Sequence, residues 1–275
     1  MAEKFVQVDG LKIRYLEEGT GPEALLLHGA SLGSSADVWE RNLVPLASYG
    51  LKVIAYDQPG FGGSDDPTDY SVAYRRGFIL KLMDALGIRK AHLVGHSQAG
   101  GMAVGLAFDR PERVSRIVIL GSGSLLPPLG SAKQGGAREG EEGTATEPTI
   151  KDTRALLEHN LFNHSLITAA ELERRHQVSI GKNFQAFLER SRAAQQGGGG
   201  AGKQSVPLWQ RLDQIPVPVL FIYGKQDRGS AAERAGVAKQ RYPRLNIHVI
   251  DRCKHLVQWD AASDFETLCG RFLTS

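Results

Sequence analysis

Cysteine is scarce in this chain, and its scarcity excludes one class of fold. Only Cys253 and Cys269 occur among 275 residues, and both lie near the C-terminus. Two cysteines in these positions do not indicate the disulfide framework of a small secreted domain. The ligand spacing of a metal site is also missing, so we expect neither a metal ion nor an organic cofactor.

Targeting and membrane-spanning segments are missing as well. Met1 is followed almost at once by the strand-like run 4–8, without the apolar region of a signal peptide. No apolar run approaches the roughly 20 residues that a transmembrane helix needs. The sequence therefore predicts a cytoplasmic protein with no membrane partner.

A large charge of one sign is the third missing feature. The 33 Lys and Arg residues nearly balance the 30 Asp and Glu residues, which leaves a net charge of +3. The basic doublets Arg75-Arg76 and Arg174-Arg175 are not accompanied by a basic stripe with interleaved aromatic residues. We therefore expect no nucleic-acid partner and a small-molecule substrate, while a homo-oligomer is left open.

The chain does contain a regular alternation of strand and helix patterns. Phe5–Val8 and Leu11–Leu16 alternate in polarity and are joined by Asp9-Gly10, which indicates a hairpin. Continuously apolar runs, typical of parallel strands buried on both faces, follow at Ala24–Leu27, Val53–Tyr56, His92–Val94 and Ile117–Leu120. Helical patterns fall between them at Val38–Ser48, Ala73–Leu86 and Gly101–Phe108. This order predicts an α/β fold with a mostly parallel central sheet flanked by helices.

The alternation stops at Gly121 and resumes near residue 211. The intervening residues 122–210 hold three helical patterns, Ile150–Leu161, Ala169–Ser179 and Phe184–Ala194, and a glycine-rich tract, Gln195–Gly202, that we expect to be a flexible loop. Strand and helix patterns then return at Val217–Tyr223, Ala231–Tyr242, Leu245–Ile250 and Asp264–Leu273. We predict a core of residues 1–121 and 211–275 with an inserted helical lid, residues 122–210.

The run Gly95-His96-Ser97-Gln98-Ala99-Gly100-Gly101 lies between a buried strand pattern and a helix pattern. A serine in such a turn is either a helix N-cap or a nucleophile lifted clear of the sheet, with small neighbours because strand and helix approach closely. The run resembles the nucleophile elbow of the α/β-hydrolase superfamily, with Ala99 where that family's motif has its second glycine. The resemblance implies the α/β-hydrolase fold.

A serine nucleophile needs a base, and the base needs an acid to orient it. The superfamily has these in the chain order serine, acid, histidine, with the last two following later strands. Asp227 follows the strand pattern 217–223 and His255 follows the pattern 245–250, so we predict the triad Ser97, Asp227 and His255. Each residue considered alone also has an ordinary interpretation: Asp227 as a solvated acid in a loop, and His255 as an imidazole at the surface.

The loop His28-Gly29-Ala30-Ser31 resembles the superfamily's oxyanion loop, which implies an oxyanion hole made by the backbone N–H groups of Ala30 and Gln98.

The chain further resembles the meta-cleavage product hydrolases in Glu147-Pro148-Thr149-Ile150, Glu173-Arg174-Arg175 and Cys253-Lys254-His255-Leu256-Val257-Gln258-Trp259. That resemblance implies Ser31 and Arg175 as substrate-binding residues; a solvated helix charge is the other interpretation of Arg175. The chain departs from the family at His96, where Asn is usual, and at Leu256, where Trp is usual.

The resemblance implies a serine-dependent hydrolase that cleaves a carbon–carbon bond in 2-hydroxy-6-oxo-hexa-2,4-dienoates, the ring-fission products of aromatic catabolism. Dehalogenases and epoxide hydrolases use an aspartate at the elbow, so Ser97 argues against both. A carboxylesterase with the same triad is one alternative. A non-catalytic ligand receptor on the same fold is an alternative of another class.

Overall fold

The computed structural model describes residues 2–130, 146–197 and 206–275. Its strands are β1 (Lys4–Val8), β2 (Leu11–Glu18), β3 (Glu23–Leu27), β4 (Lys52–Tyr56), β5 (Ala91–His96), β6 (Val114–Leu120), β7 (Val219–Gly224) and β8 (Asn246–Ile250). They form one sheet in the order β1-β2-β4-β3-β5-β6-β7-β8. The pairs β1–β2 and β2–β4 are antiparallel, and every later pair is parallel. The predicted α/β-hydrolase sheet is thus confirmed.

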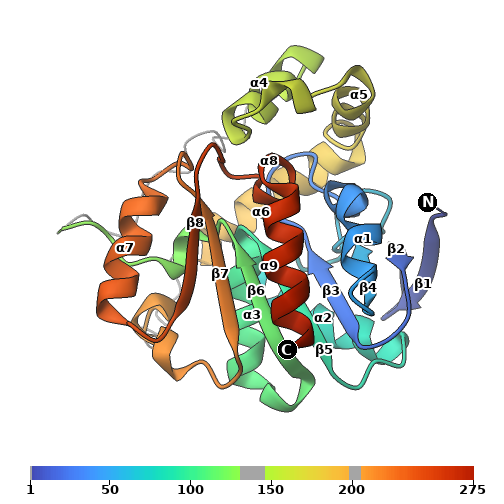
Figure 1. Cartoon of the computed structure of the whole chain (residues 1–275). Coiled ribbons are helices and arrows are strands. Elements are labelled where there is room, and N and C mark those ends of the chain that lie inside the picture. Colours follow the sequence, from blue (N-terminus) through green and yellow to red (C-terminus); the bar gives the residue numbers. More distant parts are fainter. Residues whose placement is uncertain (1, 131–145, 198–205) are drawn as a thin grey trace.

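Helices cover both faces of the sheet (Figure 1). They are α1 (Glu40–Ala47), α2 (Val72–Ala85), α3 (Gln98–Asp109), α4 (Ile150–Asn160), α5 (Ala169–Gln177), α6 (Lys182–Gly197), α7 (Ala231–Arg241), α8 (Val257–Asp260) and α9 (Ala262–Thr274). One hydrophobic core joins the sheet to α2, α3 and α7, and a second joins its other face to α1 and α9. The central strand β5 is buried along its whole length because it faces both cores, which explains its unbroken apolar run.

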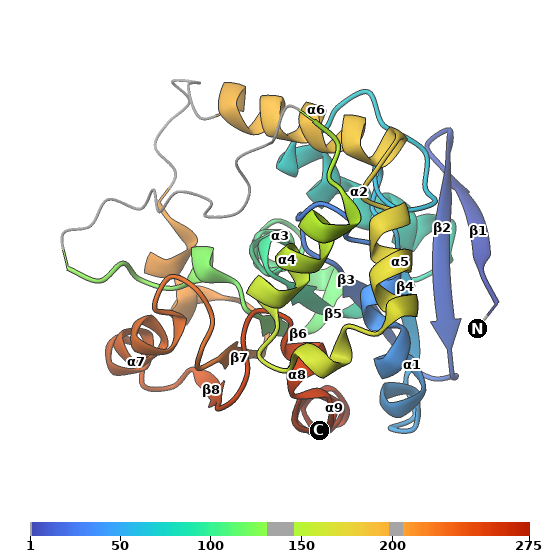
Figure 2. The same cartoon turned by 90° about the horizontal axis from the view of Figure 1, so that it is seen from above.

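The helices α4, α5 and α6 lie outside these two layers. Figures 1 and 2 place α4 and α5 side by side above the sheet, and the ring of His176 in α5 makes a 3.0 Å hydrogen bond with Thr153 in α4. Helix α6 lies on the loop after β4, where Asn183 and Arg190 donate to the carbonyls of Gly62 and Gly60. The start of α4 follows from a capping box, in which the side chains of Thr149 and Asp152 each accept the other's backbone N–H.

Among the predicted boundaries that differ from the structure, three change how a segment is interpreted. Helix α3 starts at Gln98, directly after Ser97, three residues earlier than its apolar pattern suggested. The pattern at Val38–Ser48 splits into a 3₁₀ turn and α1, because Ser35 caps the turn and not the α-helix. Helix α6 continues to Gly197, so the start of the predicted glycine-rich loop is helical. The rest of that loop lies outside the described residues, as do residues 131–143 of the predicted lid.

Buried Asp57 connects the loops that follow β3 and β4. Its carboxylate accepts the backbone N–H of Ala36 at 2.6 Å and that of Gly63 at 2.8 Å, and a guanidinium nitrogen of Arg14 lies 3.1 Å away. A Cβ on Gly62, whose φ is +53°, would lie 2.2 Å from this carboxylate, so only glycine fits there. These bonds stabilise the two loops that frame the carboxyl edge of the sheet.

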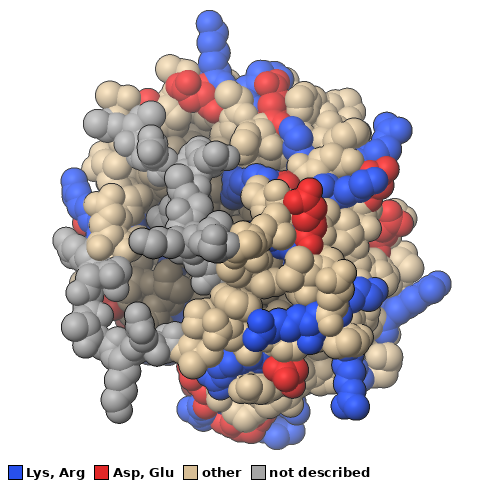
Figure 3. Space-filling view, turned by 90° about the vertical axis from the view of Figure 1, so that its left-hand side faces the viewer, with Lys and Arg blue, Asp and Glu red and all other residues tan. Residues whose placement is uncertain are grey.

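Charged side chains are spread over the surface. On the face seen in Figure 3, Lys and Arg are scattered with Asp and Glu among them. Across the described ranges, no helix is both long enough and apolar enough to cross a membrane.

Buried His92 generates a prediction about pH. It lies in β5, where burial, with the charges of Arg116 and Lys90, lowers the pKa of its imidazole to about 4. An unfolded chain binds a proton on this ring below about pH 6.5, and the folded chain does so only near pH 4. The free energy of unfolding should therefore fall as the pH drops from 7 to 5. His92→Leu should reduce that fall by about 2 kcal/mol.

Chemical unfolding at the two pH values measures this difference. His159→Gln on the exposed side of α4 is the control and should leave the fall unchanged. The same fall in wild type and His92→Leu would contradict the assigned pKa shift.

Candidate active site

Ser97 occupies a strained turn between β5 and α3. Its φ of 56° and ψ of −125° lie outside the regions that a serine ordinarily adopts. The turn is held by the Ser97 N–H, which donates to the carbonyl of Leu120 at 2.8 Å. The side chain makes no capping bond to α3, so the structure does not use this serine as an N-cap. At the carboxyl edge of the sheet, its hydroxyl makes no hydrogen bond to the residues that the structure describes.

Small residues around Ser97 allow strand and helix to meet. A Cβ on Gly95 would lie 2.7 Å from the carbonyl oxygen of Ala99, and one on Gly100 would lie 2.8 Å from the Cβ of Ser122. Ala99 itself is fully buried in the core between α3 and the sheet. The departure from glycine at this position is therefore accommodated, because its methyl group points into the core.

His255 and Asp227 come together at the same edge. Asp227 lies three residues after β7, and His255 lies between β8 and α8. The His255 Nδ1 is 3.1 Å from both carboxylate oxygens of Asp227, and both residues are buried. Asp251, the nearest alternative acid, is exposed and bonds Gln226 and Lys225 instead.

The Nε2 atom of His255 faces a guanidinium that the sequence did not indicate. The Nη2 of Arg228 lies 3.3 Å from it, and the Nη1 donates to the Oδ1 of Asn160 at the end of α4. Because a guanidinium can only donate, Nε2 accepts, and Nδ1 carries the proton directed at Asp227. This is the tautomer that a general base opposite a serine requires.

His96 supports His255 from within the sheet. Its Nε2 donates to the backbone carbonyl of His255 at 3.0 Å, and the two ring centroids are 4.8 Å apart. Burial, followed by the proximity of His255, lowers the pKa of His96 well below its usual range. It is therefore a neutral donor that fixes the position of the loop carrying His255.

Two backbone N–H groups near Ser97, those of Ala30 and Gln98, are candidates for binding an anion. Those of Ala30 and Gln98 donate to no acceptor in the described part of the chain, and Gln98 opens α3, where the helix dipole is positive. A Cβ on Gly29 would lie 3.2 Å from the Cβ of Ser97, so the loop passes very close to the serine. His28 is neutral because burial lowers its pKa to about 3, and its ring serves as a structural acceptor for Gln58 N–H at 3.0 Å.

Ser31 and Arg175 also meet. The Nη2 of Arg175 donates to the Oγ of Ser31 at 3.2 Å, and the residue is half-buried, with its Nε closed off from solvent. Its Nε has no acceptor, and no Asp or Glu among the described residues forms an ion pair with it. Burial lowers the pKa of Arg175 to about 10, so it remains charged at neutral pH. Neighbouring Arg174, by contrast, lies at the surface and pairs with Glu40 and Glu171.

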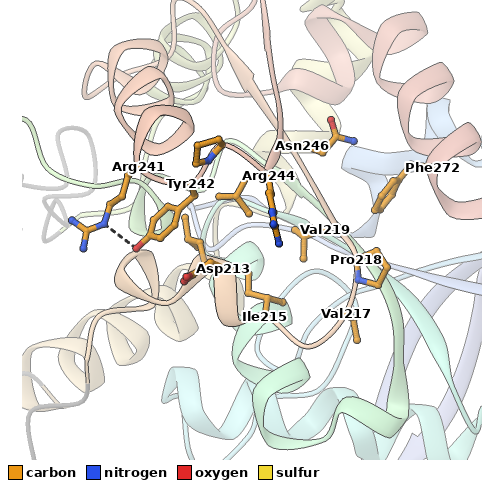
Figure 4. Close-up of a pocket in the computed structure, with 13 residues that line it drawn as sticks. Asp213, Ile215, Val217, Pro218, Val219, Arg241, Tyr242, Arg244, Asn246 and Phe272 are labelled. Atoms are coloured by element: carbon orange, nitrogen blue, oxygen red, sulfur yellow. Dashed lines mark hydrogen bonds between the residues drawn. The ribbon is translucent and has the colours of Figure 1, made fainter.

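A large open cavity lies at the opposite end of the sheet (Figure 4). It has a volume of about 730 Å³ and is lined by the starts of β7 and β8, with Val219 and Asn246, and by Arg241, Arg244 and Phe272. Ser97, Asp227 and His255 lie at the carboxyl ends of strands, so this cavity is remote from them. Open α/β sheets bind ligands at the carboxyl edge, where the constellation above is found.

Comparison with known proteins identifies the family to which this fold belongs. Residues 24–262 match the family model for the α/β-hydrolase fold. The chain belongs to the α/β-hydrolase family. It is 30% identical, over 98% of its length and 95% of the relative's, to a 2-hydroxy-6-oxononadienedioate/2-hydroxy-6-oxononatrienedioate hydrolase of Burkholderia vietnamiensis. It is 33% identical to the dihydrolipoyllysine-residue acetyltransferase component of the acetoin cleaving system of Cupriavidus necator, over 99% of this chain and 69% of that protein.

A solved structure extends the likeness to three dimensions. The meta-cleavage product hydrolase of Pseudomonas fluorescens IP01 superposes with a TM-score of 0.77 at 26% identity. The match covers 98% of this chain and 96% of that one. The similarity thus includes the helices α4–α6 as well as the sheet.

The elbow generates a prediction about packing. Gly95→Ala should destabilise the protein by about 1–3 kcal/mol, because the added methyl group meets the backbone of α3 and not a flexible side chain. Gly101→Ala, in the adjoining helix α3, is the matched control, since its Cβ would meet nothing closer than 3.4 Å. It should be neutral or stabilising, because alanine favours helix. Free energies of unfolding from denaturant titrations measure both, and equal effects would contradict the close approach.

Proposed function

We propose that this protein is a serine hydrolase that cleaves a carbon–carbon bond in a 2-hydroxy-6-oxo-dienoate, giving a 2-hydroxydienoate and a carboxylic acid. The observation that carries the proposal is half-buried Arg175, which pairs with no Asp or Glu among the described residues and lies directly beside the loop of Ala30 and Ser31. A neutral ester offers nothing to pair with such a charge, whereas the carboxylate of a dienoate does. The names of the Burkholderia relative and of the Pseudomonas structure support the same substrate class.

Ser97, His255 and Asp227 have distinct roles in this proposal. Ser97 is the nucleophile, and His255 Nε2 takes its proton. Asp227 orients the ring and stabilises the imidazolium that forms. For the transfer to occur, Nε2 exchanges the Arg228 donor, now 3.3 Å away, for the Ser97 hydroxyl. Catalytic hydrogen bonds are often loose without substrate and tighten when it binds.

The reaction proceeds in two halves. The bound dienol first becomes its keto tautomer by moving the proton of the 2-hydroxyl group to C5, so that C5 can leave with an electron pair. Ser97 then attacks the C6 ketone, and the N–H groups of Ala30 and Gln98 stabilise the oxyanion. The C5–C6 bond breaks and its electron pair moves onto the 2-oxo oxygen. The enolate formed takes the proton that His255 removed from Ser97, which gives the 2-hydroxydienoate. Water then hydrolyses the acyl-enzyme, and neither a metal ion nor an organic cofactor takes part.

The domain division belongs to the same proposal. Residues 1–121 and 211–275 form the catalytic core, and residues 122–210 form a lid. What supports it is the position of α4 and α5 above the strand ends (Figure 2) and the presence of Arg175 on α5. The lid would bring the guanidinium onto a substrate that the core activates.

Replacing the nucleophile tests the reaction class. Ser97→Ala should lower kcat by a factor on the order of 10³ or more and leave the fold and substrate binding intact, because the Ser97 side chain makes no capping bond to α3. Disappearance of the dienoate absorbance under saturating substrate measures kcat. Near wild-type turnover would exclude a serine mechanism.

Arg175 tests the substrate class. Arg175→Ala should reduce kcat/KM for a dienoate about 10- to 150-fold, the value of a charged hydrogen-bonded contact, and leave a small neutral ester almost unaffected. Arg175→Lys should recover only part, since an ammonium cannot form a two-pronged contact. Arg174→Ala is the matched control and should change neither substrate. Equal losses on dienoate and ester would favour a plain carboxylesterase.

A further inference from the structure

Arg75 joins the two segments that supply the candidate oxyanion donors. It lies on α2, where only 3% of the residue is exposed. Its Nη2 donates to the Oε1 of Gln98 at 2.5 Å, and its Nη1 donates to the Oε1 of Gln58 at 3.2 Å. One rigid guanidinium thus bridges the elbow and the loop after β4.

Gln58 extends this bridge to the oxyanion loop. Its side-chain Nε2 donates to the carbonyl of His28 at 2.6 Å, and its backbone N–H donates to the His28 ring at 3.0 Å. The ring's Nδ1 makes a 2.7 Å bond to the carbonyl of Gly29. A continuous chain of hydrogen bonds therefore runs from Gln98 through Arg75, Gln58 and His28 to the residue before Ala30.

The direction of every bond in this chain is fixed. The guanidinium only donates, so both glutamine oxygens accept, and the amide nitrogen of Gln58 is left to donate to His28. Phe61 lies against the assembly, with its ring 5.6 Å from the Arg75 Cζ and 4.8 Å from the His28 ring. The connection between Gln98 and Gly29 therefore has a single hydrogen-bond pattern.

We propose that Arg75 is a positioning residue for the oxyanion hole: it fixes the separation of the Ala30 and Gln98 N–H groups. This inference rests on the proposed function only in assigning those two groups to the oxyanion. Removing one oxyanion donor typically costs 10²–10³ in kcat, and catalytic geometry tolerates an error of only about 0.5 Å. Loosening both donors should therefore lower kcat without weakening ground-state binding.

The test uses the whole protein and a neutral ester, p-nitrophenyl acetate. Arg75→Met should lower kcat about 10- to 100-fold, with KM within about threefold of wild type. The inhibition constant of phenylboronic acid, which forms a tetrahedral anion on serine, should rise by the same factor as kcat falls. Arg76→Met is the matched control: its side chain is 39% exposed and pairs with Asp109, and it should change nothing.

A second variant covers the case in which Arg75→Met fails to fold. Gln98→Leu keeps the backbone N–H but removes the acceptor of the Arg75 bond, so it should reproduce the loss in kcat. The double variant should lose no more than the larger single effect, because both changes break one connection. Additive losses, a rise in KM alone, or unchanged boronate affinity would overturn the proposal.

The ester makes this test independent of the substrate class. It carries no carboxylate, and no carbon–carbon bond is broken in its hydrolysis. If the wild-type protein does not hydrolyse dienoates, and Arg75→Met still lowers kcat on the ester as expected, the proposed function is refuted and this inference is supported. The reverse result would refute the inference alone.

Discussion

The site depends on one strained backbone conformation, that of Ser97. A non-glycine residue in such a region costs on the order of 1–3 kcal/mol, so its surroundings must hold it there. The bond to Leu120 and the close contact of β5 with α3 at Gly95 and Gly100 do so. The same turn lifts the hydroxyl from the sheet and leaves the first N–H of α3 without an acceptor in the described part of the chain. The proposed nucleophile and the proposed oxyanion donor are thus consequences of a single constraint.

His255, the proposed base, is held from two sides. His96 bonds the His255 carbonyl from the sheet, and the end of α4 holds the same loop from above: the Leu256 N–H donates to the Asn160 carbonyl at 3.1 Å. Arg228 adds a third connection, since it contacts both Asn160 and the His255 ring. Any displacement of α4 would therefore change the position of the His255 ring. Hydrogen bonds connect the end of α4 to the loop that carries His255.

The sequence could predict the parts of the site that follow from chain order. Parallel strands end at one edge of the sheet, so Ser97, Asp227 and His255 had to approach one another once the strands were identified. Arg228 and Arg75 could not be found in this way. Their partners come from distant segments, and no spacing links Arg75 to Gln58 or Arg228 to Asn160.

The two basic doublets show the limit clearly. In Arg75-Arg76 and Arg174-Arg175 the neighbours are chemically identical, yet in each doublet one guanidinium bonds to a residue of the candidate site and the other pairs with an acid on the outer side. Only helix rotation decides which one points inward. The start of α3 was misplaced because Gln98, Ala99 and Gly100, which open that helix, include no large apolar side chain.

The burial of Arg175 explains how such a site distinguishes substrates. Desolvation has already weakened this guanidinium's hold on its proton, yet the residue stays charged at neutral pH. If Arg175 binds the substrate as proposed, the folded protein bears the cost of a charge that pairs with no Asp or Glu among the described residues until an anion arrives. A carboxylate therefore gains the direct contact and also relieves a penalty present in the empty site. A neutral ester relieves nothing, so discrimination between the two is built into the resting fold and does not need a further conformational change.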